Sequence, residues 1–255
     1  MCIRDSLITG AAGFLGRGMI APFVEHGHQL RLMDVLPFTS PHEVVVGDVT
    51  HYPAVEGAMR GVDGLVIAHM APRGMDNINY KTPAIPFAIN LTGTANLFHA
   101  AVQCGVKRVV VISSTAAVSE NPDLEPIPAS LPLRAKGYYG MTKACQEVIA
   151  EQFARTEKIQ VACLRVGYIL DGEANVDKYG KAISERNYAD TDRRDIGEVA
   201  RRCLEKTDLG YDVFTVMSTQ ESLHKAAVSY TCQRLGWKPR YDFSWLREPA
   251  KQSVG

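Results

Sequence analysis

The fold is decided by the stretch Leu7-Ile8-Thr9-Gly10-Ala11-Ala12-Gly13-Phe14-Leu15-Gly16, near the start of a chain of 255 residues. An apolar run precedes the glycines and a helical pattern follows them, so they lie where a strand ends and a helix begins. Gly10 permits a tight turn, Gly13 lets backbone N–H groups approach a pyrophosphate, and Gly16 allows close packing of helix on sheet. A glycine-rich turn without a ligand is the alternative. The position at the first strand-to-helix junction favours a dinucleotide-binding loop.

Beyond this loop, short apolar runs rich in Val and Ile alternate with longer segments of helical periodicity. This β-α-β-α order implies a parallel sheet with helices on both faces, which is an α/β, doubly wound fold. The expected strands are Ser6–Thr9, Gln29–Met33, Val44–Val46, Gly64–His69, Arg108–Ser113 and Gln160–Arg165. The expected helices are Leu15–His26, Tyr52–Arg60, Pro86–Cys104 and Tyr138–Glu157.

The alternation weakens after Arg165, where glycine and charged residues become frequent. We therefore expect one compact unit with two parts: a nucleotide-binding domain over residues 1–166 and a small, partly irregular substrate-side lobe over residues 167–255. The regular elements expected in this lobe are Ile196–Glu205, Val213–Met217 and Glu221–Leu235.

The composition describes an ordinary soluble globular protein, with 46% hydrophobic and 22% charged residues. Because 28 Lys and Arg offset 28 Asp and Glu, no net charge attracts a phosphate backbone or an anionic lipid. No apolar run approaches the ~20 residues of a membrane helix, and the first residues lack the apolar stretch of a signal peptide. We expect a cytoplasmic protein without nucleic-acid or membrane partners.

The six cysteines are widely scattered, without a C-x-x-C pair or histidines at ligand spacing, which is typical of reduced thiols. His26 and His28 flank a glycine in an expected helix-to-strand turn, where solvated turn residues are the simpler explanation. We assign no metal site.

The glycine spacing resembles the T-G-x-x-G-x-[IL]-G signature of short-chain dehydrogenase/reductase proteins, in particular the extended branch, the NAD-dependent epimerase/dehydratase family. This resemblance implies a Rossmann-type fold and an NAD-dependent oxidoreductase or epimerase. It covers roughly the first two-thirds of the chain. Further segments that resemble the family's motifs are Gly47-Asp48-Val49-Thr50, His69-Met70-Ala71-Pro72, Asn90–Leu97, Leu164–Tyr168, Arg193–Ala200 and Leu235–Pro239.

Asp34 ends the second expected strand, ~20 residues beyond the glycines. A carboxylate there can accept hydrogen bonds from the adenosine ribose hydroxyls and repel a 2′-phosphate. Val35 follows, and no Arg is present to offset the repulsion. The sequence therefore favours NAD over NADP, while a capping or turn role for Asp34 stays open.

The family resemblance also implies which residues contact the cofactor. Asp48 and Val49 would lie beside the adenine, and His69 could instead be a structural residue at a strand end. The complete set of expected contacts is Gly10, Gly13, Phe14, Leu15, Gly16, Asp34, Asp48, Val49, His69, Met70, Ala71, Tyr139, Lys143 and Gly167.

Tyr139 and Lys143 are four residues apart, so they share one face of a helix, whereas Tyr138 pairs only with Thr142. A free tyrosine has a pKa of ~10 and needs a nearby cation to act as an acid or base near neutral pH. Lys143 supplies that charge. A packed tyrosine beside a surface lysine is the alternative, and the upstream glycine motif argues against it.

A catalytic hydroxyl should come from Val110–Val118, where three hydroxyl residues end a strand. The family's S-S-[ST]-x-x-V pattern selects Thr115, with Ser114 as the alternative, and Ser113 is expected to face the sheet. Asn90 matches a position that in this family supports the lysine through water, although a capping or packing role is the alternative.

The interval between Gly167 and Asp195 is too short for the substrate lobe of most nucleotide-sugar enzymes. We therefore expect a small sugar or sugar acid as the substrate, as in the uronate dehydrogenase group of the family. A sugar epimerase is the alternative, and a nonenzymatic dinucleotide-binding module is a third. Helices Pro86–Cys104 and Tyr138–Glu157 are expected to pair with a second copy as a homodimer.

Overall fold

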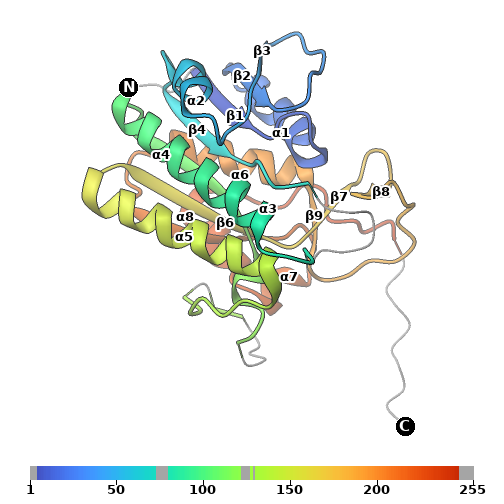
Figure 1. The fold of residues 1–255 in the computed structure, drawn as a ribbon. Coiled ribbons are helices and arrows are strands. Elements are labelled where there is room, and N and C mark those ends of the chain that lie inside the picture. The colour runs from blue at the N-terminus through green and yellow to red at the C-terminus, as the bar shows by residue number, and fades with distance from the viewer. Residues whose placement is uncertain (1–4, 73–79, 122–126, 129, 247–255) are drawn as a thin grey trace.

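The computed structural model describes residues 5–72, 80–121, 127–128 and 130–246. Within these residues, seven parallel strands form one sheet with helices on both faces (Figure 1). The strands are β1 (Asp5–Thr9), β2 (Gln29–Asp34), β3 (Glu43–Val46), β4 (Gly64–Ile67), β5 (Arg108–Ser114), β6 (Gln160–Val166) and β10 (Tyr211–Val216). Their order across the sheet is β10-β6-β5-β4-β1-β2-β3. The α/β, doubly wound fold expected from the sequence is confirmed.

The strand order reverses beside β1, because the chain first builds β2 and β3 on one side and then returns to place β4 on the other. Ligands of doubly wound sheets bind at such a reversal, outside the carboxyl ends of the strands. Gly10 lies there with a φ of +69°, and a Cβ on it would stand 2.8 Å from the Ala68 carbonyl oxygen. Only glycine fits this turn.

Two apolar cores lie on opposite faces of the sheet. Neighbouring side chains on a strand point to opposite faces, so Leu7 belongs to one core and Ile8 to the other. The Ile8 face is covered by α1 (Phe14–Val24), α6 (Arg193–Glu205) and α8 (Val228–Leu235). The Leu7 face is covered by α2 (Tyr52–Met59), α4 (Gly93–Gln103) and α5 (Gly137–Glu157).

The boundary expected after residue 166 cuts through this sheet. β10 pairs in parallel with β6, and α6 packs on α1, so part of the expected lobe completes the main fold. A smaller three-stranded sheet stands apart at the side of the molecule (Figure 1). Its strands are β7 (Tyr168–Asp171), β8 (Val176–Asp177) and β9 (Asp190–Asp192).

Two long helices expected from the sequence are divided in the structure. The segment Pro86–Cys104 comprises the end of α3 (Ala84–Pro86), a π-helix η1 (Phe87–Thr92) and α4. The segment Glu221–Leu235 holds α7 (Ser222–Lys225) and α8, which the extended residue Ala226 separates. No helix in the described part of the chain is long and apolar enough to cross a membrane.

Candidate active site

A cavity of about 420 Å³ lies at the carboxyl ends of the central strands. A second cavity of about 280 Å³ adjoins it and shares Gly10, Asp34, Val35, Met70 and Pro72 with its wall. Of the residues expected to contact a cofactor, the larger cavity brings together Gly10, Gly13, Phe14, Leu15, Gly16, Asp34, Met70, Tyr139 and Lys143. The smaller cavity adds Asp48, Val49 and His69.

The glycine-rich loop leaves the start of α1 without a side-chain cap. Gly13 is the N-cap residue, no side chain accepts a hydrogen bond from the first turn, and that turn holds no acidic residue. Gly16 lets the helix approach the loop, because a Cβ there would stand 2.3 Å from the Gly10 carbonyl oxygen. Uncapped N–H groups and the positive end of the helix dipole fit a pyrophosphate, so this part of the site suits a dinucleotide.

Asp34 has the turn role that the sequence left open, and its position in both cavity walls is compatible with the cofactor role. One carboxylate oxygen accepts a hydrogen bond from the Ala12 amide at 3.0 Å and the other accepts one from the Leu36 amide, also at 3.0 Å. The carboxylate therefore fastens the glycine-rich loop to the end of β2 and still lines both cavities. An ionised carboxylate has about four acceptor sites, which leaves capacity for ribose hydroxyls.

Two residues of the smaller cavity, Asp48 and His69, make contacts that support the local structure. Asp48 closes a turn by accepting hydrogen bonds from the amide and hydroxyl of Thr50, both at 2.8 Å. His69 is buried, and its Nδ1 lies 3.3 Å from the Thr9 hydroxyl. Burial, together with the charge of Lys143, lowers the pKa of His69 to about 4, so the ring is neutral near pH 7. The alternative of His69 as a strand-end residue fits this contact.

Tyr139 and Lys143 extend from the first two turns of α5 into the wall of the larger cavity. The Lys143 ammonium is buried and donates a hydrogen bond to the Ile112 carbonyl at 2.7 Å. Gly140 permits the close approach of α5 to the end of β5, because a Cβ there would stand 2.6 Å from the Ala116 carbonyl oxygen. The helix face that carries Tyr139 and Lys143 therefore points into the larger cavity.

Asn90 lies in the π-helix and is fully buried. Its side-chain oxygen accepts a hydrogen bond from the Ala71 amide at 2.7 Å, and its side-chain nitrogen donates to the Thr142 hydroxyl at 3.0 Å. Ala71, an expected cofactor contact, lines neither cavity. Asn90 therefore connects the segment after β4 to α5, one residue before Lys143.

The three hydroxyl residues at the end of β5 and directly after it make different contacts. Ser113 donates a hydrogen bond to Glu147 of α5 at 2.5 Å, and Ser114 accepts one from the Ala116 amide at 3.2 Å. The Thr115 hydroxyl makes no hydrogen bond to the described residues and lines a third cavity of about 570 Å³. Thr115 and Tyr139 thus lie in the walls of different cavities.

Several site features escaped the sequence analysis. Glu147 and Arg165 form a buried ion pair at 2.8 Å behind Ser113, and the position of Glu147 four residues after Lys143 was the available signal. Lys178 and Ile169, from the smaller sheet, line the larger cavity. Gly167, another expected cofactor contact, lines neither of the two cofactor-side cavities. It packs against the segment before β9, where a Cβ on it would stand 2.0 Å from the Ala189 carbonyl oxygen.

The fold and this arrangement define a dinucleotide-binding protein of the Rossmann class with a Tyr-Lys pair in its cavity. The family model for the NAD dependent epimerase/dehydratase family matches residues 6–219. The chain belongs to this family, as its motifs indicated.

Similar proteins include dehydrogenases and epimerases; a UDP-glucose 4-epimerase of Bacillus subtilis, for example, is 28% identical over 62% of this chain and 51% of its own length. A 3-beta-hydroxysteroid dehydrogenase of Mycolicibacterium neoaurum is 33% identical over 58% of this chain and 41% of its own length. A uronate dehydrogenase of Pseudomonas syringae pv. tomato is 31% identical over 63% of this chain and 58% of its own length. The chain therefore matches less than two thirds of each of these relatives. The solved structure of a uronate dehydrogenase from Agrobacterium tumefaciens in complex with NAD has a TM-score of 0.79 and 24% identity, over 98% of this chain and 92% of that one.

Proposed function

We propose that the chain is an NAD-dependent oxidoreductase that oxidises a hydroxyl group, or reduces the matching carbonyl group, of a small sugar or sugar acid. One observation carries the proposal: a single cavity wall holds the glycine-rich loop, Asp34, Tyr139 and Lys143. The groups suited to a dinucleotide and the groups suited to proton transfer therefore face one space. A module that only binds a dinucleotide has no chemical need for the Tyr-Lys pair.

In the proposed oxidation, the Tyr139 phenolate takes the proton of the substrate hydroxyl group. The Lys143 ammonium stabilises that phenolate and also holds the nicotinamide ribose. Thr115 orients the substrate oxygen, with Ser114 as the alternative, which requires the substrate to reach from the cavity of Tyr139 into the third cavity. NAD, when bound, accepts the hydride. At the other end of the site, the start of α1 holds the pyrophosphate and Asp34 holds the adenosine ribose.

A sugar acid is the proposed substrate class because of charge as well as similarity. Lys178 contributes a cation to the wall that also holds Tyr139, and its ammonium lies 4.7 Å from the centre of the Tyr168 ring. A cation in a partly desolvated wall favours a substrate with a carboxylate. The similar uronate dehydrogenase supports the same class.

The test incubates the purified protein with NAD and uronic acids, neutral sugars, nucleotide sugars or a 3-beta-hydroxysteroid, while the absorbance of reduced nicotinamide is followed. Net reduction with a uronic acid or a neutral sugar is the expected result. Interconversion of two sugars without net reduction would establish the alternative, a sugar epimerase. Turnover of the steroid alone would contradict the sugar substrate, and failure to bind NAD would contradict the proposal as a whole.

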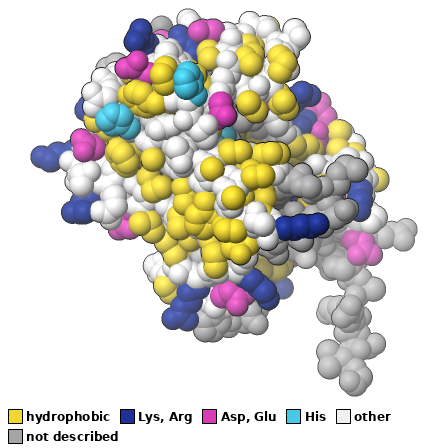
Figure 2. All heavy atoms as spheres, viewed as in Figure 1, with side chains coloured by type: hydrophobic (Ala, Val, Ile, Leu, Met, Phe, Trp, Pro, Cys, Tyr) yellow, Lys and Arg dark blue, Asp and Glu magenta, His cyan; other side chains and the backbone are white. Residues whose placement is uncertain are grey.

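We also propose that the protein forms a homodimer through the helices of the Leu7 face. Figure 2 shows apolar side chains gathered over α3, α4 and α5. Ile85, Met141 and Val148 are 55%, 42% and 46% exposed, whereas Ile149 and Phe153 pack into the core beneath. A second copy of this face would cover them, as the homodimer expected from the sequence requires.

We further propose the cytoplasm as the location of the protein. Every cysteine in the described residues is an unpaired thiol, as in proteins of reducing compartments. Cell fractionation with detection of the protein in each fraction is the test, and recovery outside the cytoplasm would contradict the proposal.

A further inference from the structure

Arg193, the first residue of α6, crosses α1 beside Gly18. A Cβ on Gly18 would stand 2.1 Å from both Cγ and Cδ of Arg193, so the arginine stem occupies the space that this glycine leaves. The helices also touch at Gly197, whose Cβ position lies 2.8 Å from the Cα of Met19. At this crossing, the two glycines and the arginine stem determine how closely α6 approaches α1.

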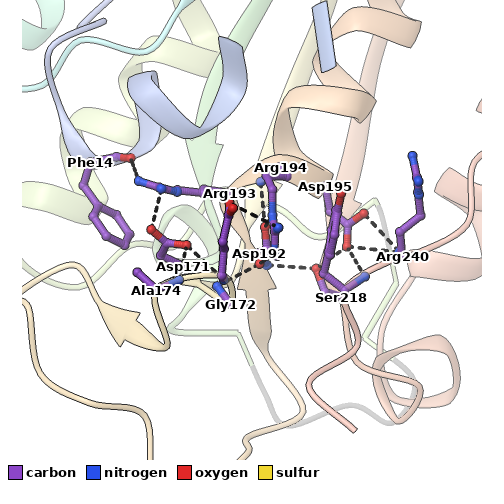
Figure 3. A network of polar contacts seen from close by, with 12 residues as sticks. Phe14, Asp171, Gly172, Ala174, Asp192, Arg193, Arg194, Asp195, Ser218 and Arg240 are labelled. Carbon is purple, nitrogen blue, oxygen red and sulfur yellow. Dashed lines mark hydrogen bonds and ion pairs between the residues drawn. The ribbon is translucent and has the colours of Figure 1, made fainter. Parts of the chain in front are cut away.

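The guanidinium group of Arg193 connects the start of α1 to the end of β7 (Figure 3). One nitrogen donates a hydrogen bond to the Phe14 carbonyl at 3.3 Å, and the guanidinium carbon lies 5.2 Å from the centre of the Phe14 ring. Another nitrogen forms an ion pair with Asp171. Phe14 starts α1 and lines the cavity, so this arginine holds one of its walls.

Asp171 belongs to the strand that supplies Ile169 to the opposite wall. It ends β7, and its other carboxylate oxygen accepts hydrogen bonds from the amides of Glu173 and Ala174, both at 3.1 Å. These bonds fix the turn between β7 and β8. The hairpin supplies Ile169, and the segment after β8 supplies Lys178, to the same cavity. Asp171 is only 4% exposed, so its ion pair with Arg193 is shielded from water.

We infer that Arg193 and Asp171 form a clamp that fixes the separation of the two cavity walls and thereby sets the affinity for the dinucleotide. Arg193 is a positioning residue in this inference, since it acts through Phe14 and the hairpin. The inference rests on the proposed function, because the ligand of the cavity is taken to be NAD. Walls held at the bound separation reduce the ordering cost that binding must otherwise overcome.

The test compares Arg193→Met, Arg193→Lys and Asp171→Asn with the unaltered protein by calorimetric titration with NAD. Methionine keeps the stem beside Gly18 and removes the guanidinium group, so the dissociation constant for NAD should rise roughly tenfold. Lysine should restore part of the affinity, because it can still pair with Asp171. The double variant that combines Arg193→Met with Asp171→Asn should bind NAD about as well as either of these single variants, since both changes open the same clamp.

Arg202→Met is the matched control, because Arg202 lies on the same helix and pairs with Glu198 away from the cavity. Its NAD affinity should equal that of the unaltered protein. In Arg193→Met, the KM for NAD should rise while kcat stays nearly constant. An unchanged dissociation constant accompanied by a lower Tm would overturn the clamp and leave a stabilising role. Unaltered protein that binds no NAD would overturn the proposed function, and the clamp with it.

Discussion

Tyr139 and Lys143 carry the chemical part of the proposal, and their neighbourhood limits how they can be replaced. Lys143 is buried with its ammonium on the Ile112 carbonyl, so its removal would disturb β5 as well as the reaction. Tyr139 is partly exposed in the cavity wall, and only its hydroxyl group is assigned a role. Tyr139 is therefore the sharper residue to test.

Tyr139→Phe should lower kcat at least ~100-fold, because proton transfer by a positioned group contributes ~10²–10⁴-fold. The ring remains, so the dissociation constant for NAD should stay nearly unchanged. Steady-state kinetics with the best substrate and calorimetric titration with NAD measure the two effects. Tyr138→Phe is the matched control on the neighbouring residue and should keep full activity. Near-normal turnover in Tyr139→Phe would refute the assigned proton acceptor.

Asp34→Asn and Asp34→Ala separate the charge of this residue from its turn role. Both variants remove the like-charge contact with a 2′-phosphate, so the preference for NAD over NADP should fall in both. Asparagine keeps one acceptor for the amide of Ala12 or Leu36, whereas alanine keeps none, so only alanine should lower Tm clearly. Dissociation constants for the two cofactors decide the outcome. An unchanged preference in both variants would mean that Asp34 serves the loop alone.

Some site residues could be predicted from spacing, and others could not. A four-residue spacing places Tyr139 and Lys143 on one helix face. The end of a parallel strand places Asp34 at the edge of the sheet where ligands bind. The choice between Ser114 and Thr115 depends on the turn after β5, where each hydroxyl takes a different direction. Gly167, an expected cofactor contact, also packs closely against the Ala189 carbonyl, which the sequence did not indicate. Sequence spacing does not reveal contacts between two segments that are distant in the chain.

Among the elements, β9 carries a pH-dependent contribution to stability. Burial raises the pKa of Asp190 from 3.8 to about 6, and its carboxylate accepts a hydrogen bond from the Asn187 amide at 2.7 Å. The folded pKa lies above the unfolded value, so the contribution is complete below about pH 4 and is lost as the pH rises through about 6.

Asp190→Asn should remove this dependence, because the neutral amide keeps an acceptor for Asn187. The free energy of unfolding of the unaltered protein, minus that of the variant, should fall by about 2 kcal/mol between about pH 4 and pH 7.5. Urea unfolding at the two pH values measures it. Asp208→Asn should show the opposite trend, because Arg234 lowers the pKa of that exposed carboxyl. A difference that rises with pH in Asp190→Asn would contradict the prediction.

The irregular helix before α4 shows what periodicity misses at the scale of an element. The apolar spacing of residues 86–104 predicts one helix, and the structure inserts a π-helix that turns Asn90 inward between Ala71 and Thr142. These hydrogen bonds join Asn90 to residues that are distant in the chain, so the local apolar spacing does not indicate them. A wider turn of this type is often found at functional sites, and here it ties β4 to the helix of Tyr139.

For the whole molecule, the proposed dimer can be broken by one charge. Val148→Asp places a carboxylate in the exposed apolar face of α5, so the variant should be a monomer that still binds NAD. Light scattering on both proteins at micromolar concentration measures the state. Val46→Asp is the control, since Val46 is also exposed but lies on β3 at the far edge of the sheet. An unaltered protein that is itself a monomer would refute the dimer.

The central sheet was largely predictable, whereas the place of its last strand was not: Val213–Met217 was expected as an element of a separate lobe, and β10 instead pairs with β6. Alternating Val-rich and helical segments specify β1 to β6 because buried parallel strands read as continuous apolar runs. The later elements lack this clear alternation of apolar strands and helices. The helix α6 is rich in arginine and glutamate that pair with one another, and α7 and α8 are short. Polar composition therefore suggested a separate lobe for residues that belong to the main fold.

The place of β10 at the edge of the sheet affects the order in which the protein can be assembled during synthesis. Its pairing partner β6 ends at Val166, whereas β10 ends only at Val216, so a ribosome must add many residues before that edge is covered. Until then the nascent chain presents an open strand whose unpaired amides and carbonyls can recruit another chain. Chains released early, without β10, should therefore aggregate and depend on chaperones.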